Sequence, residues 1–281
     1  MNITTRHDSF FSYLRPHVMF ANLWSRRQLI QRFTRREITQ RYRGLHLGII
    51  WSFISPLFLL IIYTVVFGLI LKVRWAQSRS DNIVEFALTL FCGLLVFNIF
   101  SECVNKSSSL ILNNRNYVKK VVFPLEILSV STTITAFFHG LISLVVLIVA
   151  QAVVGGGLHS SALLTPIILM PLIFFVLGVS WLLSGFGVYF RDIEQIAAVG
   201  TTALFFLTPI IYGIDAVPPR MHLFLRMNPL CSIVVNLRRV LIFGGEPDWT
   251  QWGVWMIVNA MFMLFCYAVF MRVKVGFADV V

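Results

Sequence analysis

Long stretches without a charged side chain dominate the pattern of this chain. Leu47–Leu71 carries no charge over its whole length, and Ile127–Phe190 contains no Asp, Glu, Lys or Arg. Phe86–Ser101 is also free of charge, and its apolar pattern continues through Glu102 to about Val104. A helix needs about 20 predominantly apolar residues to cross the roughly 30 Å hydrocarbon core of a bilayer. The pattern therefore predicts several membrane-spanning helices.

The stretch Ile127–Phe190 is too long for one helix, and Gly155-Gly156-Gly157 interrupts it. We therefore interpret it as a hairpin of two spans. Ile196–Tyr212 and Trp249–Met271 are two further apolar segments. The predicted fold is an all-α polytopic membrane protein with six transmembrane helices, at about 47–71, 84–104, 127–154, 162–188, 196–212 and 249–271.

The distribution of positive charge predicts the orientation. Six spans divide the chain into an N-terminal region, 1–46, a membrane domain, 47–272, and a short tail, 273–281, with both ends on the same side. If that side is cytoplasmic, the inside segments hold 16 of the Lys and Arg residues and the outside segments hold 7. Cytoplasmic loops of membrane proteins carry an excess of Lys and Arg. We therefore predict that both ends are cytoplasmic.

The region before the last span, about 213–248, does not fit a simple loop. Asn228–Leu237 is apolar but far too short to cross a bilayer, and Arg238-Arg239 is expected to stop it. Pro229 and Pro247 bound an apolar segment about half as long as a span. Such a segment fits a re-entrant or interfacial helical hairpin, and a surface loop lying on the bilayer is the alternative.

The segment before the first span, Phe20–Gly44, is basic and amphipathic, with apolar side chains at roughly helical spacing and arginines over much of the rest. Ser25-Arg-Arg-Gln28 and Thr34-Arg-Arg-Glu37 have capping-box spacing, so we expect a helix to start or restart at each. A basic amphipathic helix lies in the membrane interface. It serves either as a topology anchor or as the place where an anionic lipid headgroup enters. Arginine suits the second role, because its planar fork binds phosphate with two hydrogen bonds.

Composition agrees with a membrane protein. Of the 281 residues, 58% are apolar and 12% are charged, whereas soluble domains have about 45–50% and about 25%. In a soluble protein the net charge of +11 would suggest nucleic acid as a partner. Here the excess is explained by positive charge on the cytoplasmic side, so we expect membrane lipids and no nucleic acid.

The sequence lacks the motifs of an enzyme that drives transport by itself. It has no GxxxxGK[ST] loop for ATP, no HExxH and no GxSxG. The four cysteines are scattered and predict no metal site.

A proton-coupled carrier usually has more ionisable residues at membrane depth than Glu102 alone. A membrane-embedded glycosyltransferase needs carboxylates near the surface, for which Asp192 and Glu194 are thin support. We therefore predict that the chain forms a passage for a transported molecule and is not an enzyme. Another chain is expected to supply the energy for transport.

Three blocks of sequence carry a family resemblance. They are RREITQRYRGLHLGIIWSFISPLFLLIIYTVVFGLI at 35–70, NYVKKVVFPLEILSV at 116–130, and GVYFRDIEQI…LFFLTPIIY…NPL…RRVLIFGG…P at 187–247. In this order and spacing they resemble the permease subunits of bacterial polysaccharide ABC exporters. The resemblance is closest to O-antigen exporter permeases, and looser to capsule and teichoic-acid exporter permeases. A drug or small-lipid ABC exporter would share the spans but need not have the RRE…RYRG segment.

The resemblance implies an assembly and a cargo. It implies a homodimer of permeases with two copies of a separate nucleotide-binding ATPase subunit, which binds ATP and Mg, so this chain needs no cofactor of its own. It implies six spans, a cytoplasmic amphipathic helix before the first, and two short re-entrant helices on the outer side before the last. The cargo is a glycan on a polyprenyl diphosphate, moved across the bacterial inner membrane.

Candidate site residues fall into three groups. For the lipid headgroup and its gate we predict Arg35, Arg36, Arg41, Tyr42 and Arg43. For docking on the ATPase, by similarity to the family's coupling helix and RDI motif, we predict Asn113, Arg115, Tyr117, Lys119, Lys120, Arg191 and Asp192. For the glycan channel, on the first and fifth spans, we predict Trp51, Tyr63, Phe67, Phe205, Phe206 and Tyr212.

Each group also has a plainer interpretation. The 105–126 connection fits an ordinary basic loop, and Arg191-Asp192 fits a structural ion pair or helix cap. Any one of the aromatic residues fits simple packing.

Overall fold

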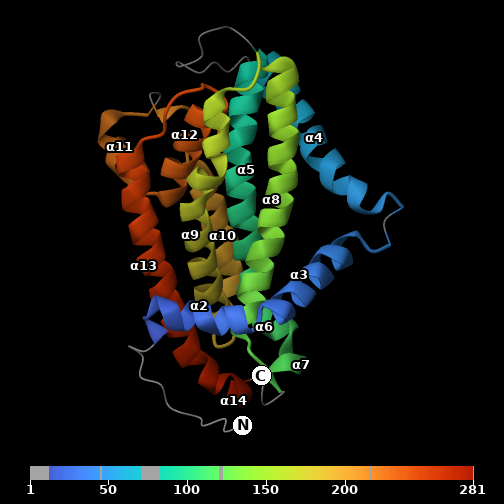
Figure 1. The fold of residues 1–281 in the computed structure, drawn as a ribbon, viewed down its shortest axis with the longest axis vertical. Helices are drawn as coiled ribbons and strands as arrows, with labels where there is room; N and C mark the ends of the chain where they lie inside the picture. Colours follow the sequence, from blue (N-terminus) through green and yellow to red (C-terminus); the bar gives the residue numbers. More distant parts are fainter. Residues whose placement is uncertain (1–12, 45, 71–82, 120–122, 215–216, 281) are drawn as a thin grey trace.

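The computed structural model describes residues 13–44, 46–70, 83–119, 123–214 and 217–280, and within these ranges it contains helices, turns and no strand (Figure 1). The helices in chain order are α2 (Pro16–Ser25), α3 (Arg27–Tyr42), α4 (Trp51–Tyr63), α5 (Ile83–Ser108), α6 (Leu110–Asn113), α7 (Arg115–Val118), α8 (Glu126–Val154), α9 (Thr165–Phe186), α10 (Ile193–Leu207), α11 (His222–Arg226), α12 (Pro229–Leu241), α13 (Trp249–Val273) and α14 (Phe277–Val280).

Among the described residues, five helical segments are long and apolar enough to cross a membrane: Gly48–Val66, Ile83–Ser108, Glu126–Val154, Ser160–Phe186 and Trp249–Val280. The chain is therefore a multi-pass membrane protein. The break between the third and fourth segments falls at the predicted glycines. There Gly156 and Gly157 have φ of 90° and 110°, which glycine adopts at little cost.

The predicted fifth span, 196–212, differs from the observed helix. α10 begins at Ile193 and ends at Leu207, so its 15 residues span about 22 Å, less than the hydrocarbon core. The helix ends because Pro209 follows Thr208, and a residue before proline is displaced from helical angles. Thr208 accordingly has extended angles, with φ −104° and ψ 136°.

α5 lies at the centre of the bundle, and α4 stands apart from it. α5 packs against α8, α9, α10 and α12, and its side chains are buried almost continuously from Phe86 to Val104. α4 leaves most of its apolar side chains exposed, among them Phe53 and Phe58. α3 and α4 form a V, drawn in blue, whose apex projects from the bundle (Figure 1). One side of the V faces α8, because α3 and α4 both pack on that helix.

The N-terminal helix breaks beside Ser25, where the sequence predicted that a helix starts or restarts, and α2 and α3 meet at Arg26. The restart predicted at Thr34 is wrong, and neither predicted cap bond forms. Ser25 Oγ donates to the carbonyl oxygen of Asn22 at 2.8 Å instead of capping α3. Thr34 lies inside α3, and its buried Oγ1 has no hydrogen-bond partner among the described residues. The break directs the Arg26 side chain to Glu126, with which it forms an ion pair.

Arg238 does not stop the apolar helix at 228–237, contrary to the sequence expectation. α12 begins at Pro229, where the Asn228 side chain accepts from the N–H of Leu230 at 3.0 Å. It continues through Arg238, whose buried guanidinium donates to the carbonyl oxygens of Thr89 (2.9 Å), Pro209 (2.6 Å) and Ile210 (2.8 Å). These bonds satisfy the guanidinium and join α12 to α5 and to the turn after α10.

The two ends of the bundle carry different elements. α2, α6, α7 and α14 lie at one end, and α11 and α12 lie at the opposite end (Figure 1). α13 runs between the two ends and packs closely on α9. The long helices thus separate a basic end from an end with short apolar helices.

Candidate functional site

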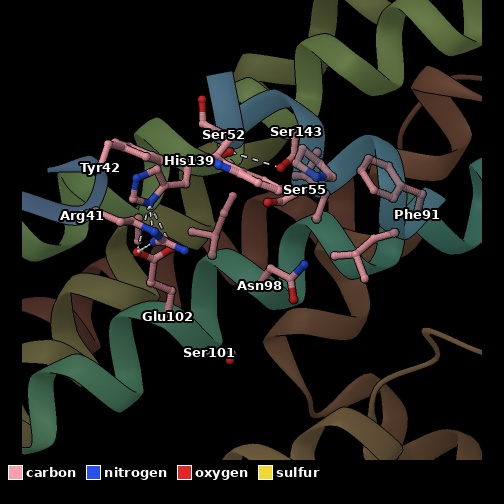
Figure 2. Close-up of a pocket in the computed structure, with 17 residues that line it drawn as sticks. Arg41, Tyr42, Ser52, Ser55, Phe91, Asn98, Ser101, Glu102, His139 and Ser143 are labelled. Atoms are coloured by element: carbon pink, nitrogen blue, oxygen red, sulfur yellow. Dashed lines mark hydrogen bonds and ion pairs between the residues drawn. The ribbon is translucent and has the colours of Figure 1, made fainter. Parts of the chain in front are cut away.

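A cavity of about 550 Å³ lies between the V of α3 and α4 and the helices α5 and α8 (Figure 2). Its polar lining comes from all four helices and consists of Arg41, Tyr42, Ser52, Ser55, Asn98, Ser101, Glu102, His139 and Ser143. Trp51, Phe91 and Leu95 are among its apolar walls. Small-molecule sites commonly have about 300–1,000 Å³ and a few convergent polar groups, so this cavity has the size and lining of a ligand site.

A charged cluster forms one wall of the cavity. Glu102 accepts from Arg41, from Lys106 Nζ at 2.8 Å and from His139 Nδ1, which lies 2.9 Å from Oε1 and 3.1 Å from Oε2. Lys106 reaches it because the two residues are four apart on α5. Arg41 Nη1 also lies 2.9 Å from His139 Nδ1. The cluster therefore fastens the end of α3 to α5 and α8.

Two other polar groups of the cavity, the side chains of Asn98 and Ser55, differ from this cluster. Asn98 faces the cavity from α5, and Ser55 faces it from α4 (Figure 2). Within the described part of the chain, neither side chain makes a hydrogen bond. Tyr42 covers the His139 ring edge-to-face, with centroids 5.9 Å apart. The cavity thus combines an ion-paired cluster, in which His139 Nε2 is buried without a hydrogen-bond partner in the described chain, with open polar groups and aromatic walls.

The predicted headgroup residues separate into three environments. Arg41 and Tyr42 line the cavity. Arg35 and Arg43 are exposed, and among the described residues they form no ion pair. Arg36 donates through Nη1 to the Tyr117 hydroxyl at 2.7 Å. The structure therefore joins a predicted headgroup residue to a predicted coupling residue.

The predicted coupling segment packs against α3. Tyr117 lies 5.3 Å from Phe33 and 4.6 Å from Phe123 between ring centroids. The neighbouring polar side chains Asn113, Arg115 and Lys119 are exposed, and Lys120 lies outside the described residues. The segment therefore has a half-buried aromatic side toward α3 and an exposed polar side.

Arg191 and Asp192 form neither of the predicted structural contacts. Both are exposed in the turn before α10, and the structure shows no ion pair between them. Asp192 occupies the N-cap position of α10 but its side chain makes no cap bond. The interpretation as an ion pair or side-chain cap is therefore wrong, and the coupling role stays a prediction.

The predicted channel aromatics are not brought together within one chain. Trp51 lines the cavity beside Glu102, and Tyr63 is half-buried at the other end of α4. Phe205 and Phe206 line a separate groove with Ser101 and Asn105. A further set of residues surrounds an apolar cavity of about 790 Å³ near α11 and α12, including Phe206 and Tyr212. The Phe67 side chain lies outside the described residues.

Sequence reasoning missed His139 and Asn98, and it noted Glu102 without its partners. A signal for two of these residues was present. Asn98 is the amide within the otherwise apolar stretch before Glu102, and Lys106 follows Glu102 at helical spacing. His139 had no local signal, because its contact with Glu102 arises from the packing of α5 on α8.

A second charged cluster surrounds Glu126 at the basic end of the bundle. This fully buried carboxylate pairs with Arg26 and accepts from Lys274 Nζ at 2.8 Å and from Asn22 Nδ2 at 3.3 Å. Asn22 also donates to the Tyr267 hydroxyl at 2.7 Å. The cluster connects α2, the start of α8 and the end of α13, directly after the predicted coupling segment.

Comparison with known proteins identifies the family. The sequence profile described as ABC-2 type transporter matches residues 28–242, about three quarters of the chain. The chain belongs to the ABC-2 type transporter family. This match spans α3 through the re-entrant candidate α12, and so it includes both faces of the cavity beside Glu102. The resemblance expected from the sequence is confirmed at this level.

Individual relatives of this ABC-2 transporter chain are transport permeases. It is 27% identical over 232 residues to the O-antigen export system permease protein RfbA of Myxococcus xanthus, covering 82% of this chain and 86% of that protein. It is 27% identical over 248 residues to a protein of the same name from Klebsiella pneumoniae, covering 88% and 92%. It is 26% identical over 234 residues to the polysialic acid transport protein KpsM of Escherichia coli, covering 82% and 85%.

Proposed function

We propose that this chain is the membrane-spanning permease subunit of an ABC exporter that carries polyprenyl-diphosphate-linked polysaccharide, such as O-antigen, across the bacterial inner membrane. The observation that carries the proposal is the family match together with relatives named O-antigen export permeases over more than four fifths of both chains. Membership of a transporter family disfavours the glycosyltransferase alternative.

In this proposal the chain crosses the membrane six times, with α10 and the turn after it as the short fifth crossing. Both ends are cytoplasmic, in agreement with the excess of Lys and Arg on that side. α2 and α3 form the amphipathic interface region, and α11 and α12 form the re-entrant pair on the outer side. The location of α2 and α14 at one end of the bundle and of α11 and α12 at the other supports this arrangement.

The proposed assembly is a homodimer of permeases with two ATPase subunits, which hold ATP and Mg. The exposed polar side of α6 and α7, together with the Arg191-Asp192 turn, is the proposed docking surface. Arg36 and Tyr117 connect that surface to α3 by a 2.7 Å hydrogen bond. A movement of α7 on ATP binding therefore displaces α3, and with it the wall of the cavity that contains Arg41.

The proposed headgroup contacts are the two exposed arginines without an ion-pair partner in the described chain, Arg35 and Arg43. They are available to a diphosphate because no carboxylate competes for them, and a guanidinium binds a phosphate with two hydrogen bonds. Arg41 acts differently, because Glu102 holds it at the cavity wall. The glycan then passes the aromatic side chains of α4 and α10 through the permease dimer.

Export in cells tests this function. In a strain lacking the gene, we expect the double variant Arg35→Ala/Arg43→Ala to restore little surface polysaccharide while still co-purifying with the ATPase. Arg226→Ala provides the matched control, because Arg226 is an exposed arginine on α11, at the opposite end. Wild-type export by the double variant would contradict the role of these arginines in headgroup binding. Normal surface polysaccharide in the deletion strain would contradict the proposed function.

A further inference from the structure

The cavity beside Glu102 contains an amide that forms no hydrogen bond with any residue that the structure describes. Asn98 lies near the middle of α5, where its neighbours Phe97, Ile99 and Phe100 are buried, yet its own side chain is exposed and lines the cavity. An amide offers two donors and an oxygen acceptor. Leaving these groups without partners at membrane depth is unfavourable. The site is therefore suited to a ligand that both donates and accepts hydrogen bonds.

The other residues that line the cavity favour a sugar ring as the ligand. Trp51 and Tyr42 supply aromatic surfaces, and the Ser55 hydroxyl is open in the described structure. A pyranose ring has hydroxyls that donate and accept, and it has apolar C–H faces that stack on indole or phenol rings. A lipid chain would fill the volume but would leave Asn98 unsatisfied.

The charge of the cavity argues against the diphosphate itself as the occupant. Arg41 and Lys106 are both engaged by Glu102, so the lining offers no free cation among its described side chains. The exposed arginines, Arg35 and Arg43, are not part of the lining. Because Arg43 directly follows Tyr42, a phosphate at Arg43 would still be near a sugar that contacts Tyr42.

We propose that this cavity binds the first sugar ring of the lipid-linked glycan, the ring attached to the diphosphate. Asn98 forms hydrogen bonds with neighbouring hydroxyls of that ring, and Trp51 and Tyr42 contact its faces. This inference rests on the proposed function and adds a selection step to it. A site built to bind hydroxyl groups rejects an analogue that lacks them, so the permease distinguishes loaded carrier lipid from bare carrier lipid.

Binding to the full chain in lipid nanodiscs tests the inference. The probes are farnesyl diphosphate and farnesyl diphosphate that carries one hexopyranose, with glucose, galactose and N-acetylglucosamine versions measured separately. We expect at least one sugar-bearing probe to bind wild type about tenfold more tightly than the bare diphosphate. We expect Asn98→Ala and Trp51→Ala to reduce that ratio to about one while the affinity for the bare probe stays unchanged.

Asn116→Ala is the matched control, because Asn116 is an exposed asparagine on α7 and lies outside the lining of this cavity. It should keep the wild-type ratio. Equal affinity of wild type for the bare probe and every sugar-bearing probe would overturn the sugar site while leaving the diphosphate role intact. The same conclusion follows if Asn98→Ala and Trp51→Ala both keep the preference. Absence of binding by any probe would count against the proposed function itself, and the sugar site would fall with it.

Discussion

The carboxylates of Glu126, which is buried, and Glu102, which is partly buried, have similar partners and different surroundings. Each is held by one arginine and one lysine from the chain. Glu126 is 0% exposed and is enclosed by α2, α8 and the end of α13, whereas Glu102 is 17% exposed and borders an open cavity. Both clusters hold the N-terminal helices, Glu126 through α2 and Glu102 through α3.

The difference indicates that the Glu126 cluster has a structural role, whereas the Glu102 cluster borders the proposed binding site. Around Glu126, a fully buried carboxylate pairs with two partly exposed cations, and Trp181 Nε1 additionally donates to the Glu126 carbonyl at 3.1 Å. Such a cluster fixes geometry, because separating any partner leaves a buried charge without compensation. Around Glu102 the same kind of cluster stands beside unused polar groups and empty volume. That arrangement leaves room for a ligand.

Of the predicted substitutions, replacement of Glu126 should have the largest effect, and that effect is on the stability of the fold. Glu126→Gln should destabilise the protein by about 1.5–3 kcal/mol, because it weakens the charged hydrogen bonds that this buried carboxylate accepts from Arg26 and Lys274, whose side chains are 35% and 26% exposed. Thermal unfolding of the detergent-purified chain measures this effect. Glu246→Gln, at an exposed glutamate, should leave the unfolding temperature unchanged. An unaltered unfolding temperature for Glu126→Gln would contradict the assigned structural role.

Replacing Glu102 should affect export more than stability, whereas replacing Glu126 should affect stability first. Glu102→Gln should cost less stability than Glu126→Gln, because water reaches this cluster and screens the remaining cations. It should nevertheless impair export strongly, since Arg41 is then free to move within the cavity. Unfolding temperature and surface polysaccharide, measured on both variants, check the prediction. If Glu102→Gln were as unstable as Glu126→Gln, or if it exported normally, the proposed difference in role between the two clusters would be contradicted.

The link between α3 and α7 should have a smaller effect. Tyr117→Phe removes the hydroxyl that accepts from Arg36 but keeps the ring that packs on Phe33 and Phe123. A hydrogen bond to a charged group contributes about 1.5–3 kcal/mol when buried, and this exposed one should contribute less. We expect nearly unchanged stability and a several-fold lower ratio of glycan exported to ATP hydrolysed. Tyr13→Phe is the control, and an unchanged ratio for Tyr117→Phe would show that this bond does not transmit movement.

The smallest expected effect is a pH dependence at a third carboxylate, Glu37, on α3 between the two clusters. Burial raises the pKa of the Glu37 carboxyl, although Thr135 and Thr132 hydroxyls oppose the rise. Since the folded pKa is raised, its stabilisation is complete below the unfolded value of about 4.3 and is lost as pH rises through the folded pKa. The unfolding temperature of wild type should therefore fall relative to Glu37→Gln as pH rises above that value. A constant difference across the same pH range would contradict the assignment.

The sequence predicted the long spans because length and absence of charge are enough to define them. The details that it missed depend on tertiary contacts. Arg238 remains within α12 because carbonyl groups from α5 and from the turn after α10 accept its hydrogen bonds. The helix break at Arg26 brings that side chain to Glu126, 100 residues further along the chain. Neither contact is visible in a local pattern.

The candidate site was predicted in pieces. Arg41 and Tyr42 were assigned to the headgroup and Trp51 to the glycan channel, but the structure places all three around one cavity. His139 is 37 positions from Glu102 in sequence, so only the packing of α5 on α8 brings them together. Phe206 and Tyr212, assigned to the same channel as Trp51, line another cavity. Part of the lining was therefore predictable from the sequence, whereas Asn98, His139 and the grouping of the residues became evident only from the fold.

Reconstitution into liposomes tests the central claim most directly. The permease is incorporated with its ATPase partner or alone, and ATP-dependent movement of a polyprenyl-diphosphate-linked glycan across the bilayer is measured by its protection from an external glycosidase. We predict movement with both subunits and ATP, none without the ATPase, and no nucleotide hydrolysis by the permease alone. Glycan movement or ATP hydrolysis by the permease alone would contradict the account.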